Sequence, residues 1–479
     1  MSTAHSRRWT ALAVIALAQF IVIMDTSIIG VALPDIQADV GFTPDGLSWV
    51  FNAYVIALGG LLLLGGRLSD LVGAKRVFSL GWVVLAAGSL AAGLADSTGV
   101  EIAARAIQGA GAALIAPSAL TLLMMLFGSD PKELTKAFAI YGAAAPAGGT
   151  AGVFLGGVIT EWISWPWVFY VNIPIALLVL AVTPRLMPSA AARRGSVDVL
   201  GALTATAGLA LTVFGVVRAP EEGWGSAATL ASIGGGVALL VLFVAVQASV
   251  RQPLMRLSIL RTPNLAAANV AQLLLGAAWI PMWFFLNLYL QQVLGYGAFE
   301  GGAALLPMTV TIMVLMVVVA PRVIARFGPK APIVAGLLVL AGGLVALSLV
   351  RPDGSFAVDV LPASLIAATG MALAFIPSLG TAISSAKPEE GGLASGIVNT
   401  SYQVGSALGL AVMTALATSQ GADRLGDAAA LTDGYSAAFL GAAGVAVAGA
   451  VLAAALLRFR AVPAEPAAEP GRDRASVAA

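Results

Sequence analysis

Residues 10–34 read TALAVIALAQFIVIMDTSIIGVALP, an apolar run whose one charged side chain is Asp25. A helix of about 20 apolar residues crosses the hydrocarbon core of a bilayer, so this run predicts a membrane span. It is too long for the core of a cleavable signal peptide, and similar runs follow along the chain. Of the 479 residues, 59% are hydrophobic and 10% are charged, against about 25% charged in a typical soluble domain. The sequence therefore predicts an all-α integral membrane protein.

The same length criterion predicts fourteen transmembrane helices. Their expected ranges are 10–34, 46–66, 77–95, 99–127, 137–160, 167–187, 199–217, 227–248, 264–290, 301–321, 331–350, 358–383, 392–418 and 436–457. The loops between these ranges are short, and only residues 461–479, rich in Ala, Pro and Glu, are expected to form a disordered tail. Such loops leave no room for a soluble catalytic or ATP-binding domain.

Basic residues give an independent test of this layout. All but four of the 25 Lys and Arg residues fall on one side of it. The exceptions are Arg218, Arg351 and Arg424 in loops on the other side and Arg105 within a span. Because cytoplasmic loops carry an excess of Lys and Arg, we expect both termini in the cytoplasm of a multi-pass protein of the bacterial inner membrane.

A faint internal repeat indicates how the spans are grouped. Residues 66–75, GRLSDLVGAK, follow the second span, and residues 321–330, PRVIARFGPK, follow the tenth. Two pseudo-symmetric six-helix bundles separated by an inserted helix pair would produce this spacing, and repeated halves are common in membrane transporters. The expected divisions are an N-terminal bundle (1–190), the inserted pair (191–255), a C-terminal bundle (256–460) and a cytoplasmic tail (461–479).

Several classes of function are disfavoured by composition. The chain has no cysteine and a single histidine, His5, so disulfides and Cys/His metal sites are excluded. A phosphate-binding loop of the type G-x-x-x-x-G-K-[ST] is missing from the sequence. We therefore expect no metal, no cofactor, no nucleic-acid partner and no enzymatic activity. A membrane-embedded enzyme and a non-transporting receptor or assembly factor are the alternatives from other classes.

Six motifs follow one another along the chain. They are MDTSIIGVALP (24–34), GRLSDLVGAKR (66–76), RAIQGAG (105–111), WPWVFYVNIP (165–174), YLQQVLGY (289–296) and GLASG (392–396). Together they resemble the major facilitator superfamily, specifically its fourteen-span drug/proton antiporter branch, over nearly the whole chain. Three positions depart from the motifs of that branch, with Gly30 for Asn, Pro166 for Arg and Val153 for the proline of the span-five antiporter motif. The resemblance implies a multidrug efflux transporter that exchanges small organic molecules for protons and confers antibiotic resistance.

Asp25 and Arg105 are the predicted proton-coupling residues. Asp25 lies about 13 Å from the outer end of its span, at roughly 1.5 Å per residue. A carboxylate at that depth must face a cavity, pair with a cation or take up a proton. We expect Arg105 to attract the deprotonated Asp25, and the resemblance implies that Arg105 takes part in proton transfer. The alternatives are a permanently hydrogen-bonded Asp25 and an Arg105 that reaches the outer interface or pairs with Glu101.

Two groups of residues are predicted to act in gating. The first is the cytoplasmic loop after the second span, where the resemblance implies a latch between the two halves and the alternative is an ordinary solvated loop. Its members are Gly66, Asp70, Gly73, Lys75 and Arg76. The second group is a face of small residues in span five, formed by Gly148, Gly152 and Gly156. Such a face allows close helix approach, either as a sliding contact or as plain tight packing.

Aromatic and polar side chains within the spans are candidate walls of a substrate cavity. They are Asn52, Tyr54, Gln108, Trp279, Trp283, Tyr289, Asn399 and Gln403. The tryptophans would offer a platform for aromatic or cationic molecules, with lipid contact as the alternative. The polar residues could instead make interhelical hydrogen bonds.

The expected substrate is a small organic molecule, neutral or monocationic, because the later spans carry no second acid at depth. We expect the protein to function as a monomer in the lipid bilayer. A dedicated exporter, or an importer, of a single metabolite on the same fold is the alternative function.

Overall fold

The computed structural model describes residues 3–42, 44–189, 198–250, 253, 257–262, 264–387, 390–422, 424 and 426–458. Within these ranges the chain is all-helical and contains no β-strand. The predicted tail, 461–479, lies outside the described residues, as does most of the loop that precedes the predicted inserted pair.

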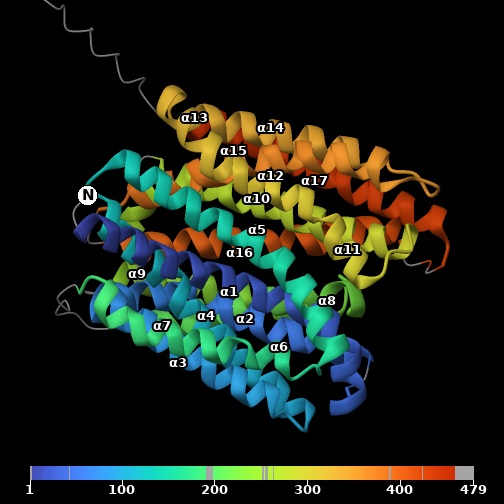
Figure 1. Ribbon diagram of the computed structural model, residues 1–479, viewed down its shortest axis with the longest axis horizontal. Coiled ribbons are helices and arrows are strands. Elements are labelled where there is room, and N and C mark those ends of the chain that lie inside the picture. The colour runs from blue at the N-terminus through green and yellow to red at the C-terminus, as the bar shows by residue number, and fades with distance from the viewer. Residues whose placement is uncertain are drawn as a thin grey trace, which may run out of the picture.

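Helices account for nearly all of the described chain (Figure 1). They are α1 (Thr3–Val40), α2 (Pro44–Leu68), α3 (Ala74–Gly93), α4 (Thr98–Phe127), α5 (Pro131–Trp162), α6 (Trp167–Tyr170), α7 (Asn172–Leu186), α8 (Val199–Glu222), α9 (Ala227–Ser249), α10 (Leu265–Leu288), α11 (Ala298–Ala304), α12 (Leu306–Val314), α13 (Ala320–Phe327), α14 (Lys330–Leu347), α15 (Leu361–Ser384), α16 (Gly391–Ser419) and α17 (Ala428–Leu456). Short π-helical or 3-10 turns extend or join them at η1 (Ser69–Gly73), η2 (Leu257–Arg261), η3 (Tyr289–Val293), η4 (Leu315–Val319) and η5 (Phe356–Val360).

Short polar side chains fix the starts of several helices. Asp130 accepts hydrogen bonds from the backbone N–H groups of Lys132 and Glu133 at the start of α5. Asp198 and Asp427 cap α8 and α17 in the same way. A capping carboxylate satisfies backbone donors that have no partner within the helix and is worth about 1 kcal/mol. Helix α8 starts at Val199 as expected, whereas α5 and α17 start at Pro131 and Ala428, before the expected 137 and 436.

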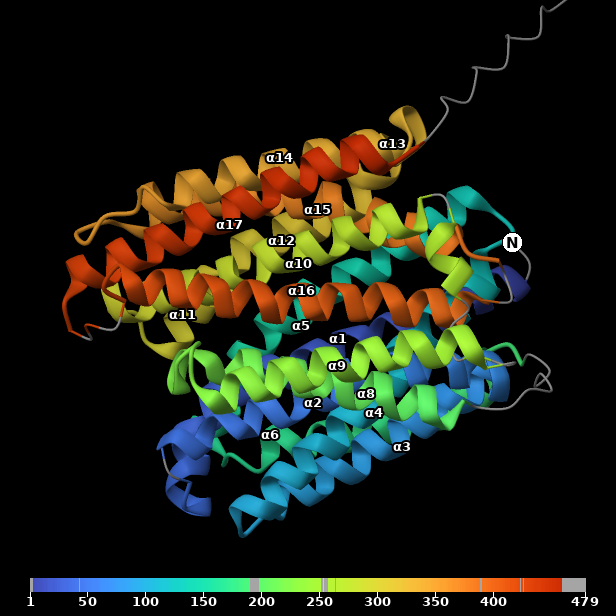
Figure 2. The same ribbon diagram turned by 180° about the vertical axis from the view of Figure 1, so that it is seen from behind.

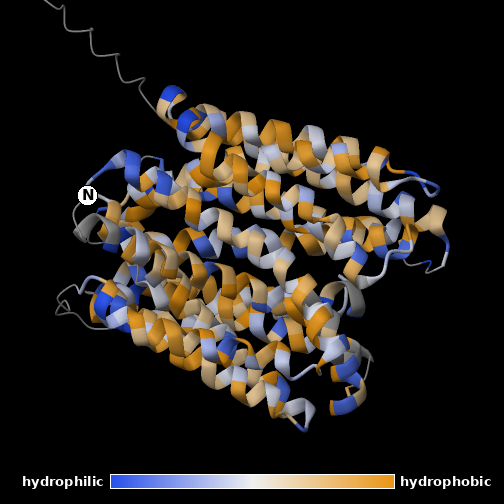
Figure 3. Ribbon diagram, in the orientation of Figure 1, coloured by the Kyte–Doolittle hydropathy of each residue, from blue (hydrophilic) through white to orange (hydrophobic). Residues whose placement is uncertain are grey.

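Eleven of the described helical segments are long and apolar enough to cross a membrane. Length alone therefore gives eleven spans rather than the predicted fourteen, partly because Trp49–Gly93 is counted as one segment of 45 residues. The apolar part of α8, Leu200–Val216, is shorter than the length required. Hydrophobic residues cover most of the length of the helices, and hydrophilic residues gather mainly at their ends (Figure 3). The chain is a multi-pass membrane protein.

The helices run side by side in two groups, with α5 and α16 where the groups meet (Figures 1 and 2). Helix α5 packs most extensively on α1 and α16 on α10, so the first group contains α1–α7 and the second contains α10–α17. Helix α5 packs against α1 and also against α11 and α12, whereas α16 packs against α10 and α17 and also against α2. Helix α8 contacts both α2 and α16, and α9 lies against α8. Each of α5, α8 and α16 therefore touches both groups.

The glycine face of α5 packs directly on the backbone of α1. A methyl group on Gly152 would lie 2.7 Å from the Met24 carbonyl oxygen and 2.8 Å from the Ser27 Cβ. One turn later, a methyl group on Gly156 would lie 2.7 Å from the Ile28 carbonyl oxygen. Contacts this short leave no room for a side chain, so the glycine face of α5 fixes the position of the α1 segment that carries Asp25.

Gly152→Ala should destabilise the protein, because the added methyl group must push α1 away from α5. Overpacking of this kind costs about 1–3 kcal/mol. The thermal unfolding midpoint of the purified protein in detergent measures the change. The matched control is Gly157→Ala on the same helix, where nothing lies within 4 Å of the added methyl group. Equal midpoints for the two variants would contradict the close α1–α5 contact.

Candidate functional site

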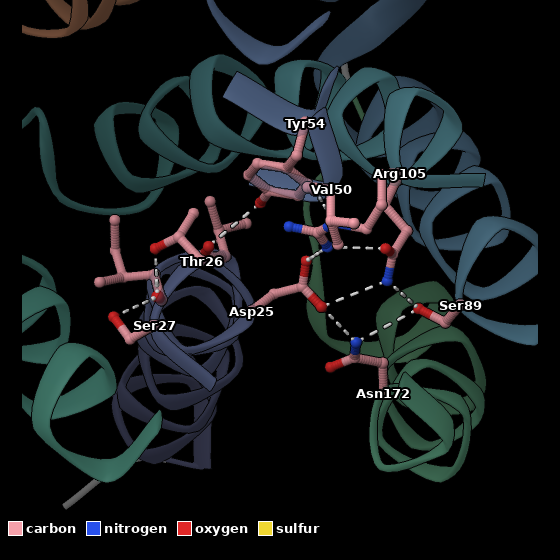
Figure 4. A network of polar contacts seen from close by, with 11 residues as sticks. Asp25, Thr26, Ser27, Val50, Tyr54, Ser89, Arg105 and Asn172 are labelled. Atoms are coloured by element: carbon pink, nitrogen blue, oxygen red, sulfur yellow. Dashed lines mark hydrogen bonds and ion pairs between the residues drawn. The ribbon is translucent and has the colours of Figure 1, made fainter. Parts of the chain in front are cut away.

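Asp25 and Arg105 form an ion pair in the interior of the first helix group (Figure 4). Arg105 Nη1, on α4, donates to Asp25 Oδ2, on α1, across 2.8 Å. Neither side chain has any exposed surface. Asp25 therefore points toward Arg105 and away from solvent, and the pair lies in surroundings from which water is excluded.

The second oxygen of the Asp25 carboxylate is held by two amide side chains. Asn172 Nδ2 donates to Asp25 Oδ1 across 2.7 Å, and Gln108 Nε2 donates to the same atom across 3.2 Å. Both amides also donate to Ser89 Oγ, at 3.2 Å from Asn172 and 2.8 Å from Gln108. Side chains from α4 and α7 thus meet at the carboxylate of α1, and Ser89 of α3 accepts from both amides.

The Arg105 guanidinium is fixed by contacts besides the ion pair. Its Nε donates to the Val50 carbonyl oxygen across 2.8 Å, and Nη1 also donates to Gln108 Oε1 across 2.7 Å. The guanidinium carbon lies 4.6 Å from the ring centroid of Tyr54 and 5.8 Å from that of Phe169. Such cation–π contacts add roughly 0.5–2 kcal/mol each. The remaining nitrogen, Nη2, has no hydrogen-bond partner among the described residues.

Glu101 lies one turn before Arg105 on α4 and is also fully buried. The sequence leaves open whether Arg105 pairs with Glu101 or with Asp25. In the structure the ion pair is with Asp25, and neither carboxylate oxygen of Glu101 has a hydrogen-bond partner among the described residues. Two carboxylates therefore lie near one guanidinium, and only one of them is bonded to it.

Each charge of this buried pair depends on the other for a partner. Moving a charged group out of water costs several kcal/mol, and the ion pair and its hydrogen bonds offset that cost only while both partners are charged. A proton on Asp25 would remove the negative charge and leave the guanidinium without its counter-ion. If Asp25 took up a proton, that proton would compete with Arg105 for the same carboxylate.

Asp70 lies at one end of the contact between the two helix groups. Its Oδ1 accepts from the Gly392 N–H across 2.9 Å, and its Oδ2 accepts from the Leu393 N–H across 3.0 Å. These donors belong to the first turn of α16, where the helix dipole also favours a negative charge. Gly66 packs against the backbone of Gly392, so a side chain at either position would separate α2 from α16.

The other residues of the predicted latch occupy different surroundings. Gly73 has a φ of +102°, a left-handed conformation that allows the chain to turn between α2 and α3. Lys75 Nζ donates to the Pro184 carbonyl oxygen across 2.8 Å, within the first helix group. Arg76 is exposed. Of the five predicted latch residues, Gly66 and Asp70 contact α16.

The eight candidate cavity residues do not share one location. Tyr54 and Gln108 belong to the Asp25–Arg105 network, and the Tyr54 hydroxyl donates to the Val22 carbonyl oxygen across 3.1 Å. The Tyr289 hydroxyl donates to the Arg351 carbonyl oxygen across 2.7 Å, in a loop at the end of the second helix group.

The remaining candidates lie elsewhere on α2, α10 and α16. Asn399 Nδ2 donates to the Ser395 carbonyl oxygen of its own helix across 2.8 Å. Asn52 on α2 and Trp279 on α10 are buried, whereas Trp283 and Gln403 are half-buried.

A hollow of about 380 Å³ opens between the two helix groups at the end opposite Asp70. Its lining residues are Asp35, Gly157, Thr160, Glu161, Gly297, Phe299 and Glu300. Three of these are acidic and none is basic. Among the described residues, no group of three or more His, Asp or Glu side chains is placed to hold a metal ion.

Sequence reasoning missed two members of the network and the place of Glu101 beside it. Asn172 lies in the motif at 165–174, which indicates the family but gives Asn172 itself no role. Glu101 was considered only as a partner for Arg105, although its spacing of four residues places it on the same helix face. Ser89 is an ordinary polar residue in an apolar span, and no pattern in the sequence distinguishes it.

Comparison with known proteins places this site in a family. The model of the Major Facilitator Superfamily matches residues 15–410. The cephamycin export protein CmcT of Amycolatopsis lactamdurans is 41% identical over 447 residues, covering 92% of this chain and 91% of that protein. The puromycin resistance protein pur8 of Streptomyces alboniger is 37% identical over 472 residues, covering 95% and 92%.

The solved structures agree on the fold. The human organic anion transporter MFSD10 superposes with a TM-score of 0.68 at 18% identity, covering 95% of this chain and all of that one. At this identity the likeness concerns the fold alone. The matched family and its relatives are transporters, so the protein is a transporter and not an enzyme. From the family match and the similarity to its relatives along most of its length, the chain belongs to the Major Facilitator Superfamily.

Proposed function

We propose that the protein is a proton-coupled antiporter that exports small organic molecules, antibiotics among them, by alternating access. The observation that carries this proposal is the buried Asp25–Arg105 ion pair, whose carboxylate can hold either a proton or the guanidinium. Two relatives are named for the export of, or resistance to, an antibiotic, which supports export as the direction of transport.

In the proposed cycle, Asp25 takes up a proton from outside after the substrate has left. The protonated acid releases Arg105, and the transporter reopens toward the cytoplasm. There the proton leaves, the ion pair re-forms and a new substrate molecule binds. Protonated Asp25 and bound substrate belong to different states of the cycle. One proton therefore enters for each substrate molecule that leaves, in separate steps.

One proton per cycle provides enough energy for resistance. A single charge crossing 100 mV yields about 2.3 kcal/mol. At about 1.4 kcal/mol per tenfold change in concentration, this maintains a roughly 50-fold gradient of a neutral substrate. A membrane-permeable antibiotic would be held at a few per cent of its outside concentration.

The proposed topology has fourteen spans with both termini in the cytoplasm of a bacterial cell. The segment Trp49–Gly93 would be roughly 68 Å long as a straight helix, about twice the hydrocarbon thickness of a bilayer, so α2 and α3 are separate spans. The positive φ of Gly73 supports a turn between them. We divide the spans into the bundles 1–190 and 256–460 and the inserted pair 191–255, acting as a monomer.

The substrate is proposed to be neutral or monocationic. The hollow between the two helix groups is lined by Asp35, Glu161 and Glu300 and by no basic residue, which favours a cation over an anion at the mouth. The alternative, a transporter dedicated to one metabolite, is favoured by the relative named for cephamycin alone. A panel containing puromycin, which carries an amine, and a cephamycin, which carries carboxylates, separates the two.

Asp70 is proposed to latch the cytoplasmic side. Its two hydrogen bonds to the first turn of α16 join the two helix groups, and they must break when that side opens. Hydrogen bonds to a charged group contribute about 1.5–3 kcal/mol each. Such a latch would set the balance between inward-open and sealed states.

Asp25→Asn should abolish proton-driven transport, because an amide cannot exchange a proton with the surrounding solution. Uptake of puromycin into inverted membrane vesicles, energised by an imposed pH gradient, measures this effect. We expect uptake to fall at least tenfold, to the level of vesicles without the protein.

The control for this experiment is Asp353→Asn, which neutralises an exposed carboxylate in a loop. It should transport like the wild type. Full proton-driven uptake by Asp25→Asn would remove Asp25 from the coupling mechanism.

Asp70→Ala should open the cytoplasmic side more often. The protein has no cysteine, so a single Ser395→Cys substitution on α16 provides a unique label at a buried position. We expect a hydrophilic thiol reagent to label this cysteine about tenfold faster in the Asp70→Ala background, equivalent to about 1.4 kcal/mol. An unchanged labelling rate, equal to that in an Asp353→Asn background, would show that Asp70 is not a latch.

A further inference from the structure

Glu101 is a buried acid that takes no part in the Asp25–Arg105 ion pair and so has no structural role there. Its side chain has no exposed surface, and neither oxygen has a hydrogen-bond partner among the described residues. An ionised carboxylate in such a place costs several kcal/mol, and even a neutral polar group without a partner is destabilising. Packing alone would be better served by an apolar side chain of the same size. The presence of a carboxyl group therefore calls for a functional explanation.

The surroundings of Glu101 contain one cation and one competing acid. Arg105 follows one turn later on the same helix, and the two charged groups that act on Glu101 electrostatically are Arg105 and Asp25 of α1. Among the network residues contributed by the other packed helices, the titratable group is Tyr54 of α2, while α3 and α7 present the neutral Ser89 and Asn172. Arg105 Nη2 is itself without a hydrogen-bond partner among the described residues. One guanidinium thus has a bonded carboxylate and an unbonded one within its neighbourhood.

We propose that Glu101 is a proton-loading site that shares one proton with Asp25 around Arg105. While Asp25 is ionised and bonded to Arg105, the proton is on Glu101. When Arg105 changes partner to Glu101, the O–H bond of Glu101 breaks and an O–H bond forms on Asp25, so that the number of protons and the total charge are unchanged. Arg105 keeps all its protons and always faces one carboxylate anion.

The position of Glu101 gives this exchange a direction. Glu101 lies in the first turn of α4, which begins at Thr98, whereas Arg105 and Asp25 lie deeper. In the proposed topology that end of α4 faces outside, so a proton arriving from outside reaches Glu101 before Asp25. This step rests on the proposed function, because it supplies the outside proton that the antiport cycle requires.

The first test detects the proton itself and needs no substrate. The infrared carbonyl band of a protonated carboxylic acid should be present in the purified wild-type protein at neutral pH and missing in Glu101→Gln. It should also be missing in Asp25→Asn, because Arg105 without Asp25 takes Glu101 as its counter-ion and ionises it. The control, Asp96→Asn, neutralises an exposed carboxylate just before α4 and should keep the band. A band that survives in Glu101→Gln, or that persists in Asp25→Asn, would overturn the proposal.

The second test measures transport of puromycin in inverted vesicles. Glu101→Gln should reduce puromycin uptake driven by a pH gradient at least tenfold. It should reduce puromycin exchange with equal pH on both sides of the membrane much less. Glu101→Asp should restore part of the pH-driven uptake. Wild-type levels of pH-driven uptake in Glu101→Gln would overturn the role of Glu101. Loss of both activities in both variants would assign Glu101 to structure, which also overturns it. A wild-type protein that moves no puromycin under a pH gradient would instead count against the proposed function, while the infrared result still decides the protonation of Glu101.

Discussion

A guanidinium buried inside a membrane protein must always have an anion beside it. Arg105 has no exposed surface and cannot lose its charge at any physiological pH. Its counter-ion in this structure is Asp25, supported by the amides of Gln108 and Asn172. Any state in which Asp25 is protonated must therefore provide another anion or move the guanidinium. In the proposed cycle, this requirement would connect a single proton to a rearrangement of helices.

The fold holds the backbone that carries Asp25 tightly in place. Helix α1, which carries Asp25, lies directly on the glycine face of α5, where Gly152 leaves no space for a side chain. Helix α5 in turn touches α11 and α12 of the second helix group. A displacement of the α1 backbone around Asp25 would thus be transmitted to the contact between the groups. At the other side of the molecule, Asp70 and Gly66 join α2 to α16.

The cost of burying charge made part of this site predictable from sequence. Asp25 and Arg105 stand out because charged residues are rare in membrane spans, and the structure brings them into contact. The helix positions follow from apolar length, but the number of spans does not, since a turn at Gly73 joins two helices into one apolar segment. The cavity candidates could not be located, because an amide or an aromatic ring serves equally well in packing, as the hydrogen bond of Asn399 to its own helix illustrates. Neither carboxylate oxygen of Glu101 has a hydrogen-bond partner among the described residues. This depends on where side chains from several helices point, and spacing along the chain does not specify that direction.

The most direct test of the central claim counts the protons that leave the protein when substrate binds. Purified transporter in weakly buffered detergent solution is mixed with puromycin, and a pH indicator records the release. If a proton and Arg105 compete for Asp25, the wild type should release about one proton per puromycin bound, and Asp25→Asn should bind puromycin without releasing any. Equal proton release by the wild type and Asp25→Asn would contradict the account.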